Sequence, residues 1–157
     1  HEGSELDFPM VVLVNDQTAS GAEIVSACLQ DHRRAYVVGE RSFGDGSIQT
    51  INDFGDGQIK LTTATFRRPS GECLYKRDPE ALKNDTWGVK PDLVVPLSEK
   101  ERTELFDHLR NNEVIPRRDV KPKEKEPEFK DVELERAVEY LGDQIKTASA
   151  NPIKKAG

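Results

Sequence analysis

Ser20 is the residue whose type and position best fit nucleophilic chemistry. It follows an apolar run over residues 11–14 and stands in a turn of small residues, just before a stretch with helical periodicity. The first N–H groups of a helix are unpaired, and the positive end of the helix dipole faces any anion that forms there. A serine at the point where a strand turns into a helix is therefore placed for nucleophilic chemistry. Without further context, the same position also suits a helix N-cap.

A glycine loop over residues 43–49 is the second chemical feature, because a catalytic partner for the serine is to be sought there. The loop offers Asp45, which is also an ordinary residue for a tight turn. A carboxylate is a far weaker base than the neutral amine of a lysine, and its charge would repel an oxyanion. His32 is a poor substitute, because it lies roughly 18 Å along the predicted helix at about 1.5 Å per residue.

The elements that must position these residues are predicted from hydrophobic patterns. An apolar strand over 11–15, a helix over 20–33 and a strand over 35–38 form a strand–helix–strand unit, which favours parallel pairing. Strands over 48–52 and 59–66 flank a glycine-rich turn, the signal of a hairpin. A short strand over 93–95 completes the set.

Composition changes after Pro96. Ser98 can cap a helix, and the charges and prolines that follow indicate an extended linker. Leu134, Val138, Leu141 and Ile145 indicate a final amphipathic helix that needs a surface to lie on. The predicted divisions are a leading segment over 1–9, a core over 10–97, a helix over 98–113, a linker over 114–130, and a helix with its tail over 131–157.

Charge and length limit the class of protein. The 157 residues are 33% charged and only 35% hydrophobic, with a net charge of −6. This balance predicts one modest core and argues against nucleic acid as a partner. We expect no membrane span and no signal peptide in this chain, and we find no metal-type spacing of cysteines.

The order of motifs resembles the C-terminal processing peptidases, also called tail-specific proteases. In that family a strand ending in Val-Asn leads to the nucleophilic serine, and a loop of the form Phe-Gly-Lys-Gly-x-Val-Gln follows. The resemblance covers about residues 9–97. The matching segments of this chain are 14–15, 20–25, 29–32, 34–35, 39–40, 43–49, 60–64, 69–71 and 88–92.

The resemblance implies roles for individual residues. Ser20 falls on the nucleophile, and the N–H of Gly21 on one donor of the oxyanion hole. Gln49 falls on the glutamine that orients the catalytic lysine, and Asp31 on an aspartate with a supporting, mainly structural role. The lysine itself is replaced by Asp45, so the base of the Ser–Lys dyad is missing at its usual position.

Two functional hypotheses follow. In the first, the chain is the serine-bearing part of a serine endopeptidase that cleaves extended tails of protein substrates. In the second, it is a non-catalytic relative that binds peptides and has lost the base at position 45. If the chain is an enzyme despite Asp45, its base must be relocated. The family segment Asp-Leu-Arg-x-Asn-x-Gly-Gly, which supplies the other oxyanion donor, is not among these residues. We therefore expect a part of a catalytic domain that does not hydrolyse peptides alone.

The resemblance also implies a fold and a setting. We expect an α/β fold with a mixed sheet and packed helices, like the crotonase-type core of this family, present here as a partial domain. Neither a metal nor a cofactor is implied. Protein or peptide C-terminal tails are the implied partners, a homo-oligomer is left open, and the implied location is extracytoplasmic, commonly periplasmic.

Overall fold

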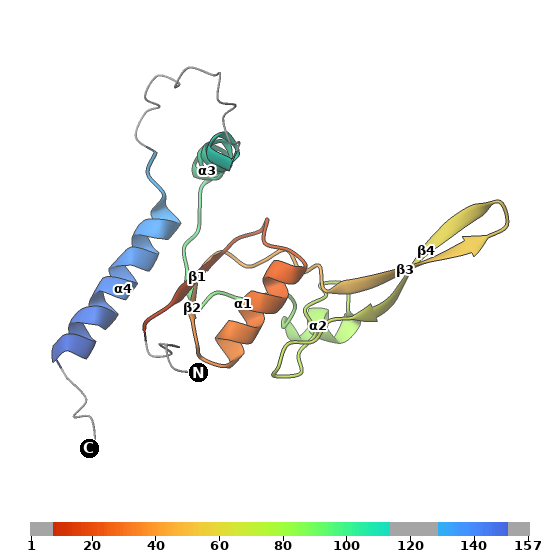
Figure 1. Ribbon diagram of the computed structural model, residues 1–157, viewed down its shortest axis with the longest axis horizontal. Helices are drawn as coiled ribbons and strands as arrows, with labels where there is room; N and C mark the ends of the chain where they lie inside the picture. The colour runs from red at the N-terminus through yellow and green to blue at the C-terminus, as the bar shows by residue number, and fades with distance from the viewer. Residues whose placement is uncertain (1–7, 114–128, 151–157) are drawn as a thin grey trace, which may run out of the picture.

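The computed structural model describes residues 8–113 and 129–150. Its centre is a three-stranded parallel sheet in the order β1-β2-β5, formed by β1 (Val11–Val14), β2 (Tyr36–Gly39) and β5 (Leu93–Val94). The helix α1 (Gly21–Asp31) connects β1 to β2, so both strands run in the same direction. In Figure 1 this helix and α4 (Val132–Ala150) lie on opposite sides of the sheet.

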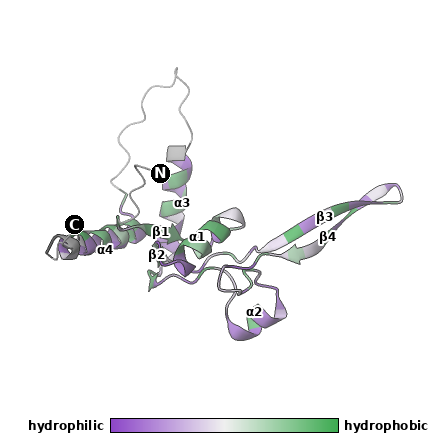
Figure 2. Cartoon of the chain, turned by 60° about the horizontal axis from the view of Figure 1, so that its bottom comes forward, coloured by the Kyte–Doolittle hydropathy of each residue, from purple (hydrophilic) through white to green (hydrophobic). Residues whose placement is uncertain are grey.

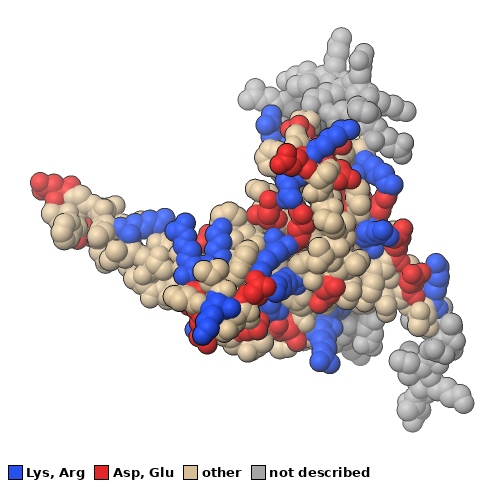
Figure 3. Space-filling view, turned by 180° about the vertical axis from the view of Figure 1, so that it is seen from behind, with Lys and Arg blue, Asp and Glu red and all other residues tan. Residues whose placement is uncertain are grey.

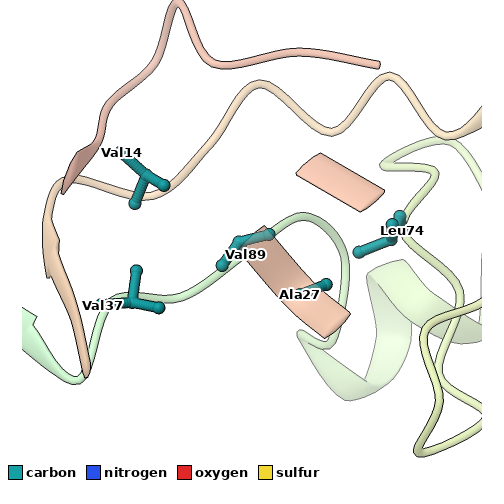
Figure 4. Close-up of a cluster of buried hydrophobic side chains, with 5 residues drawn as sticks. All are labelled: Val14, Ala27, Val37, Leu74 and Val89. Atoms are coloured by element: carbon teal, nitrogen blue, oxygen red, sulfur yellow. The ribbon is translucent and has the colours of Figure 1, made fainter. Parts of the chain in front are cut away.

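The hydrophobic core lies between α1 and the sheet. Val12 pairs with Val37 and Val14 with Gly39 in the register of β1 and β2, so alternate valines point toward the helix. The cluster shown in Figure 4 also draws on the chain beyond β4. Its buried members are Val14, Ala27, Val37, Leu74 and Val89.

A long hairpin projects from this body (Figure 1). It consists of β3 (Ser47–Phe54) and β4 (Gly57–Thr65), which pair antiparallel with a register shift between Ile48 and Gln49. Nearly all of its residues are exposed, and the Phe54 residue is 74% exposed. Figure 2 shows hydrophobic segments along both strands.

The sequence predicts a mixed sheet with a β hairpin in addition. Within the described residues the sheet of β1, β2 and β5 is entirely parallel, and the antiparallel strands form the separate hairpin sheet. The hairpin strands pair only with each other and do not join the parallel sheet. The α/β class is confirmed, with the parallel and antiparallel strands segregated. Strand patterns predict which neighbours in the sequence pair, but they do not reveal whether a hairpin joins a neighbouring sheet.

In the part of the chain that the structure describes, three further helices follow the hairpin: α2 (Pro79–Asn84), α3 (Glu99–Glu113) and α4. The side chain of Tyr140 in α4 stacks on Tyr36 of β2, with ring centroids 4.1 Å apart. Ala137 is buried at the same contact surface, whereas Leu134, Val138 and Ile145 remain exposed. The helix therefore docks on the core through a face other than most of its predicted apolar stripe.

Parts of the predicted organisation lie outside the described residues. These are residues 1–7 of the leading segment, 114–128 of the linker, and the tail over 151–157. Within the described part of the chain, every helix is too short or too polar to traverse a bilayer. Acidic and basic side chains are interspersed on the face shown in Figure 3, without a broad basic area there.

Candidate active site

Ser20 stands at the N-cap of α1 in a strained backbone conformation, with φ 54° and ψ −121°. Positive φ is uncommon for a residue other than glycine and persists only where the surroundings enforce it. A sharp, strained strand-to-helix turn that exposes a serine is the geometry of a nucleophile elbow. Ser20 and the neighbouring Gly21 are both exposed, and Ser20 forms a capping box with Glu23 at the start of the helix.

The chain before Ser20 is fixed by a tight turn. The Asn15 N–H donates to Thr18 Oγ1 at 3.0 Å, and the Thr18 N–H donates back to the Asn15 carbonyl at 2.9 Å. The Thr18 carbonyl in turn accepts the N–H of Phe43 at 2.9 Å. The serine turn is thus bonded directly to the start of the glycine loop.

A buried carboxylate completes the connection between the turn and the loop. Glu23, in the first turn of α1, is 0% exposed. Its Oε2 accepts the N–H of Ser20 at 3.1 Å and that of Asp45 at 2.8 Å. Its Oε1 accepts the N–H of Gly44 at 2.7 Å and the hydroxyl of Ser42. Residues 20 and 45 are therefore neighbours, as the sequence analysis requires.

The far side of the glycine loop is packed too closely for a side chain at position 44. A Cβ on Gly44, whose φ is +81°, would lie 2.8 Å from both the Trp87 ring and Lys76 Cβ. The Arg41 guanidinium also stacks on the Trp87 ring, with its central carbon 3.6 Å from the ring centroid. The Trp87 ring therefore packs directly against the glycine loop at Gly44.

Asp45 and Gln49 are linked by a short polar relay. Gln49 Nε2 donates to Ser47 Oγ at 3.1 Å, and Ser47 Oγ donates to Asp45 Oδ1 at 3.3 Å. Gln49 also donates to Thr62 Oγ1 on β4 at 2.7 Å. The structure thus connects two of the predicted site residues, with an acceptor where the family resemblance expects a cation.

Asp31 lies at the other end of α1, away from Ser20. It accepts hydrogen bonds from the Arg68 guanidinium and from the Ser70 N–H at 2.8 Å. Burial raises the pKa of Asp31, but the hydrogen bonds from Arg68 and Ser70 outweigh it and leave that pKa below the ordinary 3.8. These contacts join α1 to the chain after the hairpin.

Lys76 is a neighbour of the loop that the sequence analysis missed. Its N–H donates to the Gly44 carbonyl at 3.0 Å, and its ammonium lies 3.6 Å from the centroid of the Phe43 ring. Its separation of 56 residues from Ser20 left no local pattern by which to find it. His32, by contrast, caps the far end of α1.

An apolar groove of about 610 Å³ lies between the serine turn and α3. Thr18, two residues before Ser20, is at its edge. Its apolar wall is formed by Leu97, Leu105, Phe106 and Leu109. An extended chain entering this groove would pass close to the turn that carries the serine.

The fold and this geometry together define an α/β protein with a serine on a strained strand-to-helix turn. Its family is peptidase family S41: residues 1–95, more than half of the chain, match that family, and the chain belongs to it.

Relatives of known name agree with this assignment. The chain is 40% identical over 116 residues to the carboxy-terminal-processing protease of Bartonella bacilliformis, covering 67% of this chain and 24% of the relative. It is 36% identical over 100 residues to the carboxy-terminal processing protease CtpA of Bacillus subtilis, covering 63% and 19%. The chain therefore spans about a quarter or less of the length of these relatives.

A solved structure shares the fold. Mature CPAF, solved in complex with lactacystin, has a TM-score of 0.50 and 24% identity, covering 71% of this chain and 21% of that one. This likeness supports the α/β architecture of the described residues.

Proposed function

We propose that the full-length protein is a serine endopeptidase that cleaves extended tails of protein substrates. The observation that supports it most is the exposed Ser20 at φ 54° and ψ −121°, bonded through Glu23 to the glycine loop. Membership of peptidase family S41 supports the same function. Relatives named as carboxy-terminal-processing proteases suggest the tail as substrate.

In the proposed reaction Ser20 Oγ bonds to the carbonyl carbon of the scissile peptide while a base accepts the hydroxyl proton. The N–H of Gly21 stabilises the oxyanion of the tetrahedral intermediate. The C–N bond then breaks and the amine leaves with a proton, so an acyl ester remains on Ser20. Water hydrolyses that ester and restores the hydroxyl. Gln49 is assigned a supporting position on the glycine-loop side of this centre, and Asp31 a structural one at the far end of α1.

Asp45 and Lys76 are the two residues to consider as the base that accepts the Ser20 proton. Asp45 occupies the position of the family lysine, and its carboxylate is a weak base. Lys76 is the candidate for a relocated base, because its side chain lies against the same loop at Phe43 and Gly44. An Asp45→Lys substitution and a Lys76→Met substitution therefore test different versions of the mechanism.

The first experiment is labelling of the full-length protein with a serine-directed phosphonate in parallel with cleavage of an extended peptide. We expect covalent label on Ser20 and loss of both label and cleavage in Ser20→Ala. Ser98→Ala, at an exposed serine before α3, is the matched control and should behave as wild type. If the wild-type protein shows no label and no cleavage, the endopeptidase function is ruled out.

A second function, non-catalytic binding of protein tails, is favoured by Asp45 itself. In this case the protein retains the strained Ser20 turn and the apolar groove beside α3, but it has no base at position 45. Peptide binding measured by fluorescence anisotropy should then be retained in wild-type protein that shows no hydrolysis. The two functions predict opposite results in the labelling experiment.

The Asp45→Lys substitution separates the two functions within one protein. Hydrolysis gained by Asp45→Lys, where the wild type has none, would identify a relative that has lost its base. Equal hydrolysis by wild type and variant would instead show that position 45 is not the base. In that case Lys76→Met should lower the rate by at least about 100-fold, the range of general base catalysis.

We also propose an extracytoplasmic location, which rests on the family resemblance. The two relatives named above are bacterial processing proteases. Fractionation of cells that carry the full-length protein tests this proposal, and recovery only from the cytosol would contradict it. The mass of the purified protein in solution will decide whether it forms a homo-oligomer.

A further inference from the structure

We propose that Glu23 is a positioning residue, which holds the Ser20 elbow and the glycine loop in the relative arrangement that the reaction needs. This inference rests on the proposed function, because it assigns Glu23 a task in the same site. No motif match in the sequence assigned a role to this residue, which by type is an ordinary first-turn glutamate favoured by the helix dipole.

The hydrogen bonds of Glu23 set it apart from such a glutamate. A carboxylate withdrawn from water is costly unless its oxygens are fully bonded. Here each oxygen accepts two bonds, and three of the four donors are backbone N–H groups that a side-chain substitution elsewhere cannot remove. The fourth donor, Ser42, is 2% exposed and accepts the Val89 N–H at 2.7 Å.

The bonds of Glu23 add to the single bond between the Phe43 N–H and the Thr18 carbonyl, which joins the same two segments two residues earlier in each. Ser20 holds a strained φ, and the loop at residues 40–46 has no regular secondary structure. Oε2 bonds the N–H groups of residues 20 and 45 at once, so one atom directly connects the two backbones at these positions. A shift of about 1 Å at a reacting centre can cost roughly 100-fold in rate.

Glu80 provides a matched control. It too is a glutamate in the first turn of a helix, α2, but it is exposed, and Asp78 rather than Glu80 caps that helix. Glu23→Gln keeps the shape of the side chain but replaces one acceptor oxygen by an NH₂ group, which cannot accept the N–H groups it would face. Glu80→Gln makes the same chemical change at an exposed side chain, away from the N–H groups and the hydroxyl that bond Glu23.

The experiment measures the rate of phosphonate labelling at Ser20 in the full-length protein, together with the thermal midpoint. We expect Glu23→Gln to slow labelling by at least 10-fold and to lower kcat of peptide cleavage with KM within about threefold. The midpoint should stay high enough that the protein is folded at the assay temperature. Glu80→Gln should match wild type. Wild-type labelling and kcat in folded Glu23→Gln would overturn the proposal.

Amide hydrogen exchange keeps the test independent of hydrolysis. If the wild type is not labelled, the endopeptidase fails, and the exchange of the Gly44 and Asp45 amides decides whether Glu23 positions the loop. Exchange at least 10-fold faster in Glu23→Gln, with β1 and β2 unchanged, supports the role; unchanged exchange overturns it. If Glu23→Gln does not fold, Ser42→Ala replaces it in the same measurements, with the same two outcomes.

Discussion

Asp31 and Glu23 are the two acidic side chains by which α1 is bonded to loops much later in the chain. Glu23 bonds the loop at residues 42–45, and Asp31 bonds Arg68 and the N–H of Ser70. Both ends of the helix are therefore fixed by carboxylates rather than by apolar packing alone. The Arg68 and Asp31 side chains are 9% and 13% exposed, so their pairing occurs largely out of water.

We predict that Asp31→Asn will lower the free energy of unfolding by about 2–4 kcal/mol at pH 7, because the largely buried guanidinium of Arg68 then keeps only the half-exposed carboxylate of Glu72, 4.0 Å away, as a counter-charge. Urea denaturation measures the loss. Asp143→Asn is the control, because the Asp143 pair with Lys146 is exposed and should contribute less than about 1 kcal/mol. Equal losses in the two variants would contradict the structural role of Asp31.

The pH dependence of this contribution has a defined sign. The pKa of Asp31 lies below its ordinary 3.8 in the folded protein, so its stabilising effect is present above about pH 4. It is lost as the pH falls through the lower, folded value. The acid limb of the stability curve should therefore be shallower in Asp31→Asn than in the wild type.

The elements of this chain follow local patterns, and those patterns predict them well. The strand–helix–strand unit and the hairpin at Gly55 are confirmed, because periodicity and turn chemistry are properties of neighbouring residues. The adjacency of Ser20 and Asp45 could be predicted only through the motif order of the family. The role of Glu23 and the position of Lys76 could not, because each depends on contacts between distant segments.

The docking of α4 is a second feature that periodicity could not predict. The sequence predicts that its apolar stripe needs a surface, either this domain or a partner, and in the structure Leu134 and Val138 are exposed. The contact instead uses the small side chain of Ala137, which allows close approach, and the ring of Tyr140 stacked on Tyr36. Helix periodicity identifies an apolar face without identifying the surface that it covers.

We predict that Tyr140→Ala will release α4 from the sheet, at a cost of about 1–3 kcal/mol from lost apolar burial and ring stacking. Hydrogen exchange of the α4 amides should accelerate, with α1 unaffected. Tyr140→Phe retains the stacked ring and is the control. If the alanine variant exchanges no faster than the phenylalanine variant, the stack does not hold the helix.

At the scale of the whole molecule, the ends of β1 and β2 meet α3 and α4 around a group of charged residues. Arg102 of α3 pairs with Glu40 and Asp16 at 2.8 Å each. Glu133, in the first turn of α4, is 4% exposed, and its Oε1 has no hydrogen-bond partner within the described part of the chain. One arginine thus stands against several carboxyl groups at the junction of four elements.

Burial raises the pKa of Glu133 from 4.5 to about 7, and the negative charges of Asp131, Glu40 and Asp16 add to the rise, while Arg102 opposes it. The folded protein therefore holds a proton on Glu133 that the unfolded chain has released above about pH 4.5. Stability from this group is complete below pH 4.5 and is lost as the pH rises toward and through 7. Docking of α4 should weaken over that interval.

We predict that Glu133→Gln, which mimics the protonated form, will remove this dependence. Between pH 5 and pH 8 the free energy of unfolding of the wild type should fall by about 1–3 kcal/mol because of Glu133, and that of the variant should fall by much less. Unfolding by urea and exchange of the α4 amides, each followed against pH, measure the loss. Glu139→Gln, an exposed change on the same helix, should retain the wild-type slope. A Glu133→Gln profile parallel to wild type would show that Glu133 is already ionised in the folded protein, and that the junction tolerates its charge.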